Sequence, residues 1–261
     1  MPRTTGAAST SWYLDPLVAE QKRAVHLDLM RAWSNSSPPA RLLKTDLFEE
    51  ANGDDHILFD IAPAPHRRFG IDLNIATVQC AARRFEQPGA SLFCCDARRL
   101  AIASDSLDAI VSTSTLDHLG SKDELRGALV DLARVLRPGG RLVLTLDNPR
   151  NPLYWVLRLL SSWGCMPFRL GVTVSRSRLI RMLEQAGLEV LDSRMLIHNP
   201  RLISTILFLA LRRLLGRRAD GPIAFLLHAF AALERLPTRE FTGCFSAVRA
   251  RKPVPATGAR R

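Results

Sequence analysis

Two aspartates stand at or near the ends of short apolar runs in the first half of the chain. Asp72 lies in the run from Phe69 to Leu73, and Asp96 directly follows the run from Leu92 to Cys95. Apolar runs of this length, separated by helical patterns, are typical of buried parallel strands. In such sheets, ligands bind beyond the carboxyl ends of the strands. We therefore expect the two carboxylates to project into one crevice.

Hydroxyl side chains follow a third apolar run, which extends from Leu107 to Ser112. The first two of them are Thr113 and Ser114. On a neighbouring strand they would reach the same crevice. Their alternative role is that of turn residues with solvated hydroxyls.

The elements that must position these residues alternate along the chain. Further strand candidates are Arg41 to Thr45, Arg141 to Leu146, Leu188 to Leu191 and Thr242 to Ala250. Asn74 is a suitable N-cap for a helix that follows Asp72, and Ser121 with Glu124 forms a capping box for another. The helical faces expected to be buried are Ile75, Val78, Ala82 and Phe85 in the first helix, and Leu125, Leu129, Leu132 and Leu136 in the second, which ends at Pro138-Gly139-Gly140. The alternation predicts an α/β fold with a doubly wound, mostly parallel, seven-stranded sheet and extra C-terminal helices.

The charge and the cysteine content indicate which binding partners and which cellular compartment to expect. The chain of 261 residues has a net charge of +11, and nearly all of its basic residues are arginines. Because these arginines are scattered and rarely interleaved with aromatic residues, binding to nucleic acid is disfavoured. Five cysteines without a CxxC pair fit neither a disulfide framework nor a zinc site, and Cys94 and Cys95 are expected to fill the core. No secretory signal is visible, which favours the cytoplasm.

Three segments together resemble the core of class I S-adenosylmethionine-dependent methyltransferases. They are GIDLN from Gly70, CCDARRLAIASDSLDAIVSTSTLDHL from Cys94 and ELRGALVDLARVLRPGGRLVLTLDNP from Glu124. The resemblance is to the small-molecule branch, methyltransferase type 11, which is typified by the quinone-biosynthesis enzymes. It covers roughly residues 41–150, and it depends on the order and spacing of the segments.

The resemblance implies S-adenosylmethionine as cofactor and a role for each matching position. Asp72 matches the acid that accepts hydrogen bonds from the ribose hydroxyls, and Leu73 follows it. Asp96 matches the acid that binds the adenine amino group, with the backbone N–H of Ala97 at the ring nitrogen. Thr113 falls beside the expected methyl group. The alternative for either aspartate alone is a helix cap or turn former.

One motif departs from the family pattern. The family has an acid followed by a glycine-rich turn, whereas this chain has TDLFEEANG, from Thr45 to Gly53. Asp46 is present and Gly53 is the segment's single glycine, so the backbone approaches a ligand less closely here. Either Asp46 and Glu49 hold the cofactor's ammonium group or binding is weakened. A metal at these acids is not expected, because no His or Cys accompanies them.

A general base is required only if the methyl acceptor must lose a proton. His118, just past the fourth strand, is the first candidate, and Asp147, after the fifth, is the second. A single histidine in a loop can equally be a surface or packing residue.

The expected organisation has four parts. Residues 1–40 form an N-terminal helical cap, 41–150 the cofactor-binding core, 151–250 a C-terminal part with apolar helical insertions and the last two strands, and 251–261 a disordered tail. Apolar segments 202–215 and 223–233 are interpreted as a lid over a small hydrophobic substrate, with direct contact to a membrane surface as the alternative. The predicted function is methyl transfer to a lipid, quinone precursor or secondary metabolite. The alternative is a non-catalytic binding protein with this fold, and the oligomeric state stays open.

Overall fold

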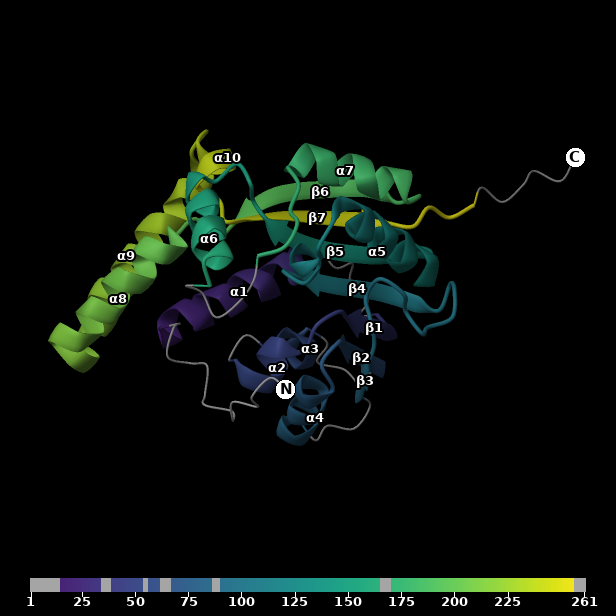
Figure 1. Cartoon of the computed structure of the whole chain (residues 1–261), viewed down its shortest axis with the longest axis horizontal. Helices are drawn as coiled ribbons and strands as arrows, with labels where there is room; N and C mark the ends of the chain where they lie inside the picture. Colours follow the sequence, from purple (N-terminus) through teal and green to yellow (C-terminus); the bar gives the residue numbers. More distant parts are fainter. Residues whose placement is uncertain are drawn as a thin grey trace, which may run out of the picture.

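The structure is a computed structural model, and it describes residues 15–33, 39–53, 56–61, 67–85, 90–164 and 170–255. Within these residues, a seven-stranded sheet has the order β3-β2-β1-β4-β5-β7-β6 (Figure 1). The strands are β1 Arg41–Lys44, β2 Arg67–Asp72, β3 Ala90–Cys94, β4 Leu107–Thr113, β5 Leu136–Asp147, β6 Glu189–Leu196 and β7 Phe245–Arg251. Every pairing is parallel except the two made by β7. The doubly wound, mostly parallel sheet expected from the sequence is confirmed.

Helices cover both faces of this sheet. α5 Lys122–Val135 and α7 Arg176–Gln185 pack on one face, and the other carries α1 Pro16–Trp33, α2 Phe48–Asn52, α3 Ile57–Asp60 and α4 Ile75–Arg84 (Figure 1). Neighbouring residues of a strand point to opposite faces, so Leu43 lies in the core under α5 and Leu42 in the core under α2. The remaining helical elements are η2 Leu116–His118, α6 Pro152–Ser162, α8 Arg201–Leu215, η3 Gly216–Ala219, α9 Asp220–Ala232, η4 Leu233–Arg235 and α10 Arg239–Thr242.

The strand order reverses at β1, which pairs with β2 on one side and with β4 on the other. After β1 the chain enters α2 on one face of the sheet, whereas after β4 it passes through η2 to α5 on the other face. In open α/β sheets, ligands bind where the connections diverge in this way. The carboxyl ends of β1 and β4 are therefore the expected centre of the site.

Two helix predictions need correction. In α4, Val78 is buried as predicted, but Ile75 and Ala82 are exposed and Ala81 takes their place in the core. The reason is that α4 packs near the sheet edge against α2 and β3, where it buries only a narrow stripe. α5 ends at Val135, and β5 already includes Pro138-Gly139-Gly140, which the sequence pattern marked as the end of the helix.

The two predicted N-cap residues, Asn74 and Ser121, cap their helices in the structure. The Asn74 side chain accepts from the backbone N–H of Ala76, and the Ser121 side chain accepts from that of Glu124. The Glu124 carboxylate accepts from the backbone N–H of Gly120, one residue before the position a capping box specifies. Both predicted N-termini are thus fixed by their own side chains.

Two further predictions are wrong in part. Cys94 is exposed at the end of β3 and does not fill the core, while Cys95 is half-buried. Arg251 belongs to β7, and Lys252 exchanges backbone hydrogen bonds with Gly139 and Gly140, so the ordered chain extends beyond the expected start of the tail. The remainder of the predicted tail, residues 256–261, lies outside the described residues.

Helices α8 and α9 pack against each other as a hairpin, here called the α8–α9 hairpin, at the carboxyl-end edge of the parallel strands (Figure 1). Its core is small and consists of Phe208, Ala219, Ile223 and Leu227, with partly buried side chains of α1 beside them. In the part of the chain that the structure describes, no helix combines the length and apolar character needed to cross a bilayer.

Candidate active site

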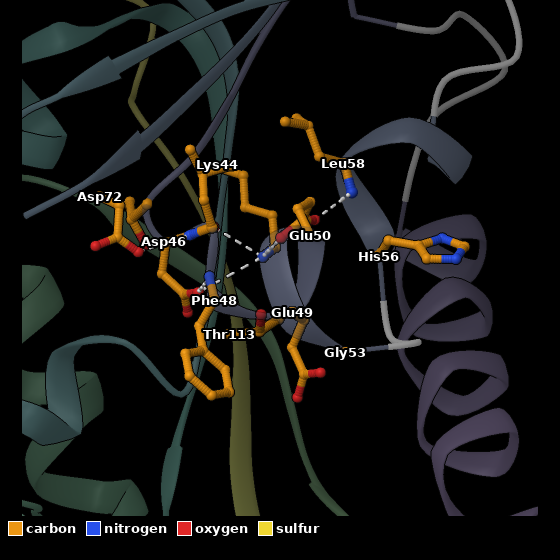
Figure 2. Close-up of polar contacts among 12 residues, drawn as sticks. Lys44, Asp46, Phe48, Glu49, Glu50, Gly53, His56, Leu58, Asp72 and Thr113 are labelled. Carbon is orange, nitrogen blue, oxygen red and sulfur yellow. Dashed lines mark hydrogen bonds and ion pairs between the residues drawn. The ribbon is translucent and has the colours of Figure 1, made fainter. Parts of the chain in front are cut away.

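Three residues after β1, Thr45 to Leu47, lead into α2, and two aspartates cap the start of that helix. The backbone N–H of Phe48 donates to Asp46 Oδ1 at 2.8 Å, and that of Leu47 donates to Asp72 Oδ2 at 3.2 Å. These are among the first amides of α2, which have no partner within the helix. Carboxylates are favoured here because the helix dipole is positive at this end. Asp46 and Asp72 are thus brought together across neighbouring strands β1 and β2 (Figure 2).

A buried ion pair stabilises the same turn. Lys44 Nζ lies 2.6 Å from Glu50 Oε2 and donates to the carbonyl of Asp46 at 2.8 Å. Glu50 Oε1 accepts from the backbone N–H of Leu58 at 3.0 Å, which ties α3 to α2 (Figure 2). Burial raises the pKa of Glu50, while the charge of Lys44 acts against this shift. Sequence reasoning missed this pair, because lysine and glutamate are normally surface residues.

Gly53 and Glu49 do not join this group. Gly53 ends α2, at the opposite end of the helix from Asp46, and its carbonyl accepts from Arg84. The Glu49 carboxylate lies 2.7 Å from Lys22 Nζ on α1. Within the described residues, no group of three or more His, Cys, Asp or Glu side chains is arranged to hold a metal ion.

The residues matched to the nucleoside lie at the ends of β2 and β3. Asp72 is half-buried; burial raises the pKa of its carboxyl group, although backbone amides of Asn74 and Leu47 donate to it. Leu73 is exposed beside it, and its carbonyl accepts from the Cys94 thiol. Asp96 begins the turn that contains Ala97, and side-chain hydrogen bonds from Arg98 lower the pKa of its carboxyl group.

Hydroxyl side chains gather at the carboxyl ends of β1 and β4. Thr45 Oγ1 donates to Ser112 Oγ at 2.8 Å, and Thr115 Oγ1 donates to Asp46 Oδ2 at 3.3 Å. Thr113, the last residue of β4, is buried beside them. Ser114 has a left-handed φ of 49°, and its buried Oγ has no hydrogen-bond partner among the described residues. A strained residue with an orphaned hydroxyl at a strand end indicates a ligand-facing position.

A second charged group lies beyond β4 and β5. Asp147, the last residue of β5, is buried, and its Oδ1 lies 2.8 Å from Nη1 of Arg201, the first residue of α8. Its backbone N–H donates to Asp117 Oδ2 at 3.2 Å. Asp117 is 4% exposed, and its buried Oδ1 has no hydrogen-bond partner in the described part of the chain. Burial, and then the charge of Asp147, raise the pKa of Asp117 to about 7.

Of the two predicted bases, Asp147 is placed centrally and His118 peripherally. The His118 ring is exposed on η2, and its Nε2 lies 4.0 Å from Asp117 Oδ1. Sequence reasoning missed Asp117, although it is adjacent to His118 in the chain. It also missed Arg201, for which the one signal was its position at the start of the apolar segment after Asn199-Pro200.

A small cavity opens at this second group. Its lining consists of Asp147, Asn151, Leu153, Tyr154, Leu157, Arg201 and Cys244. Burial raises the pKa of the Cys244 thiol to about 11, so this cysteine is protonated at neutral pH and is a poor nucleophile. The cavity thus presents a charged end and an apolar side from α6, which suits a molecule with one polar group on an apolar body.

The donor set can be compared with the expected cofactor. At the nucleoside half, Asp72 and Asp96 offer acceptor oxygens for hydroxyl and amino groups. At the methionine half, the Asp46 carboxylate after β1 and the orphaned Ser114 hydroxyl after β4 offer polar groups at neighbouring strand ends. The residues therefore fit S-adenosylmethionine, with side chains in place of the glycine-rich turn.

Comparisons with known proteins point to one family. A family model described as a methyltransferase domain matches residues 51–144. The biotin biosynthesis bifunctional protein BioHC of Cellvibrio japonicus is 26% identical over 155 residues, which are 59% of this chain and 29% of that protein. The chain therefore spans less than a third of the length of this relative.

Two solved structures show the same fold. The N-methyltransferase NodS of Bradyrhizobium japonicum, in complex with S-adenosyl-L-homocysteine, is similar with a TM-score of 0.57 and 18% identity over 95% of this chain and 94% of that one. The [4+2]-cyclase SpnF is similar with a TM-score of 0.54 and 20% identity over 88% of this chain and 80% of that one. At these identities the likeness concerns the fold and not the reaction.

Proposed function

We propose that the chain is an S-adenosylmethionine-dependent methyltransferase of type 11, the domain whose model matches residues 51–144, and that it methylates a small, hydrophobic acceptor. One observation supports the cofactor most directly: Asp72 and Asp96 lie at the ends of adjacent strands β2 and β3, beside the point where the strand order reverses. In the proposed complex, Asp72 accepts from the ribose hydroxyls with Leu73 beside the adenine. Asp96 and the backbone N–H of Ala97 bind the adenine edge.

When bound, S-adenosylmethionine supplies an electrophilic methyl group on a positively charged sulfur. Asp46 and Ser114 are proposed to hold the polar end of its methionine part, and Thr113 lies on the path to the acceptor. Placement of donor and acceptor in line supplies most of the rate in such a transfer, so these residues act mainly by positioning. Gly53 is too far along α2 to share this role.

The acceptor is proposed to bind in the cavity at Asp147, Tyr154 and Arg201. The bound cofactor would supply the methyl group, and the carboxylates at this cavity would receive the proton that the acceptor gives up. Asp147 lines the cavity, and the neighbouring Asp117 has a pKa suited to receiving a proton near neutral pH. His118 is proposed to act through Asp117, because its ring lies beside that carboxylate.

The acceptor class follows from the apolar side chains near this cavity. Leu153 and Leu157 line it, and the α8–α9 hairpin adds a large apolar surface. A lipid, a quinone precursor or a secondary metabolite has the matching chemistry. We propose a cytoplasmic enzyme that meets its acceptor at a membrane surface.

A non-catalytic binding protein is the second candidate. The altered turn after β1 favours it, since the segment has no glycine before Gly53 and the buried pair of Lys44 with Glu50 ties β1 to α2. SpnF shows that a chain of this fold can have a description other than methyltransferase. The two candidates differ in whether the crevice binds S-adenosylmethionine.

The test is a thermal-shift titration with S-adenosylmethionine and S-adenosylhomocysteine. A ligand at a hundred times its dissociation constant stabilises a fold by roughly 2.7 kcal/mol, which for a chain of this size raises the midpoint by about 5 to 10 °C. A saturable shift with both ligands would support the enzyme. No shift at millimolar ligand would leave the binding protein as the better explanation.

Asp72→Ala identifies the site of that binding. We expect a loss of affinity of roughly tenfold or more in a folded protein, because the variant removes charge-assisted hydrogen bonds to the ribose. Asp108→Ala is the matched control: Asp108 also accepts from a backbone amide, that of Arg41, but at the opposite edge of the sheet. Equal affinities of the two variants would remove Asp72 from the site.

A further inference from the structure

Two helices beside the cavity expose apolar stripes to solvent. On α6, Trp155, Val156 and Leu159 are exposed, and Trp163, the residue that caps the end of this helix, is 68% exposed. On α8, the exposed residues are Ile203, Ile206, Leu207 and Leu214, and Leu214 is 79% exposed. The spacing on α8 is that of one helical face, and the two helices are in contact. We call these eight side chains the α6–α8 surface.

The charges on these helices have one sign. Residues 152–162 and 201–219 contain arginines and no Asp or Glu. Arg201 pairs with Asp147, and Arg212 pairs with Asp15 and Asp220. Three more arginines, Arg213, Arg217 and Arg218, are exposed at the tip of the α8–α9 hairpin, and no ion pair involves them within the described residues. A partner that complements an arginine cluster without ion pairs and the exposed leucines beside it would carry negative charge on its surface and have an apolar interior.

From these observations we propose that the α6–α8 surface docks on a bilayer that contains anionic phospholipids, with Arg213, Arg217 and Arg218 at the headgroups. Tryptophans are suited to the bilayer interface, because one end of the ring system is apolar and the other can hydrogen-bond. α8 is too short to span a bilayer, so it lies in the interface plane. Nucleic acid would satisfy the arginines but leave the apolar side chains uncovered.

Membrane docking would place the cavity beside the bilayer, where a hydrophobic acceptor dissolves. This link between docking and the acceptor depends on the proposed function. Leu153, Tyr154 and Leu157 of α6 and Arg201 of α8 line the cavity, so the same two helices form both the membrane surface and the acceptor site. An acceptor dissolved in the bilayer would reach the carboxylates without crossing water. In Figure 1 the α8–α9 hairpin and α6 lie together at one end of the sheet, where the parallel strands have their carboxyl ends.

The experiment is co-sedimentation of the full chain with vesicles of phosphatidylcholine alone and with about one third phosphatidylglycerol. We expect binding to the anionic vesicles, weakened by salt, with a blue shift of tryptophan fluorescence. The variant Arg213→Gln/Arg217→Gln/Arg218→Gln should bind roughly 100-fold more weakly. The variant Trp163→Ser/Leu214→Ser, which keeps the arginines, should show no blue shift with the anionic vesicles.

The matched control is Arg83→Gln with Arg178→Gln and Arg181→Gln, which removes the same charge from exposed positions on α4 and α7. Equal weakening by both triple variants would overturn the proposal, because binding would then follow net charge alone. Absence of vesicle binding, or a dimer in sedimentation equilibrium that the Trp163→Ser/Leu214→Ser variant dissociates, would overturn it as well. The cofactor titration without vesicles tests the proposed function separately, so one can fail while the other holds.

Discussion

Asp117 and Asp147 are two buried carboxyl groups that share one guanidinium, that of Arg201. Removing a carboxylate from water disfavours its charged form, and a neighbouring carboxylate adds to this effect. Arg201 contacts Asp147 directly, whereas burial and the charge of Asp147 raise the pKa of Asp117 to about 7. The residue that sequence reasoning overlooked is therefore the one best suited to exchange a proton.

The raised pKa of Asp117 has a consequence for stability. Its folded value, about 7, lies above the unfolded value, so between about pH 4 and pH 7 the folded state binds a proton that the unfolded state has released. Stability is therefore lost as the pH rises through this window. Asp117→Asn cannot lose a proton, and we expect it to be more stable than the native protein at pH 8 by roughly 2 to 4 kcal/mol. Denaturant unfolding at pH 5 and pH 8 measures the difference.

Asp131→Asn is the control for this prediction. Despite its desolvation, the pKa of Asp131 is lowered, because Arg134 and the backbone N–H of Leu100 donate to its carboxylate. Its replacement should therefore destabilise the protein at pH 8. If Asp117→Asn destabilised it equally at both pH values, the Asp117 carboxyl would be a structural hydrogen-bond acceptor without a titration in this range.

At the scale of elements, the turn from β1 into α2 depends on Lys44 and Glu50. Replacing Lys44 by Met leaves Glu50 buried without its partner, which is expected to cost roughly 3 to 5 kcal/mol of unfolding free energy. The double variant Lys44→Met/Glu50→Leu removes both charges and should recover most of that loss. Lys22→Met, which breaks a solvent-accessible pair with Glu49 whose side chains are 23% and 21% exposed, should cost about 1 kcal/mol or less. If Lys44→Met also cost only about 1 kcal/mol of unfolding free energy, the prediction would fail, because water would then reach the Glu50 carboxylate.

The same turn marks the limit of what the sequence predicts. A short, buried apolar run bounded by turn residues predicts a strand more clearly than any other element. The sequence therefore predicted β2, β3 and β4, and with them the strand-end positions of Asp72, Asp96 and Thr113. Pairs such as Lys44 with Glu50 carry no such signal, because each residue alone resembles a surface residue. Asp147 and Arg201 are 54 positions apart in the chain, and the packing of whole helices brings them into contact. Local sequence patterns do not encode such packing.

At the scale of the whole molecule, stability is distributed unevenly. The sheet and its helices share two large cores, whereas the α8–α9 hairpin has four buried apolar residues of its own. The hairpin is attached to the remainder of the protein through Arg201 at its start, through contacts of α9 with α1, and through Arg212, whose Nε lies 2.6 Å from Asp15 Oδ2. Elements with few buried contacts open at lower free energy than the core.

This difference predicts the order of amide hydrogen exchange. Amides of α8 and α9 should exchange well before those of β4 and β5, because opening of the hairpin exposes little apolar surface. Arg212→Ala should speed exchange in α8 and α9 by roughly fivefold to tenfold, since it releases both Asp15 and Asp220, and should leave β4 and β5 unchanged. Arg213→Ala removes the adjacent arginine, which lacks an ion pair among the described residues, and should have no such effect. If exchange in β4 rose together with that in α8, the hairpin would belong to the same cooperative unit as the sheet.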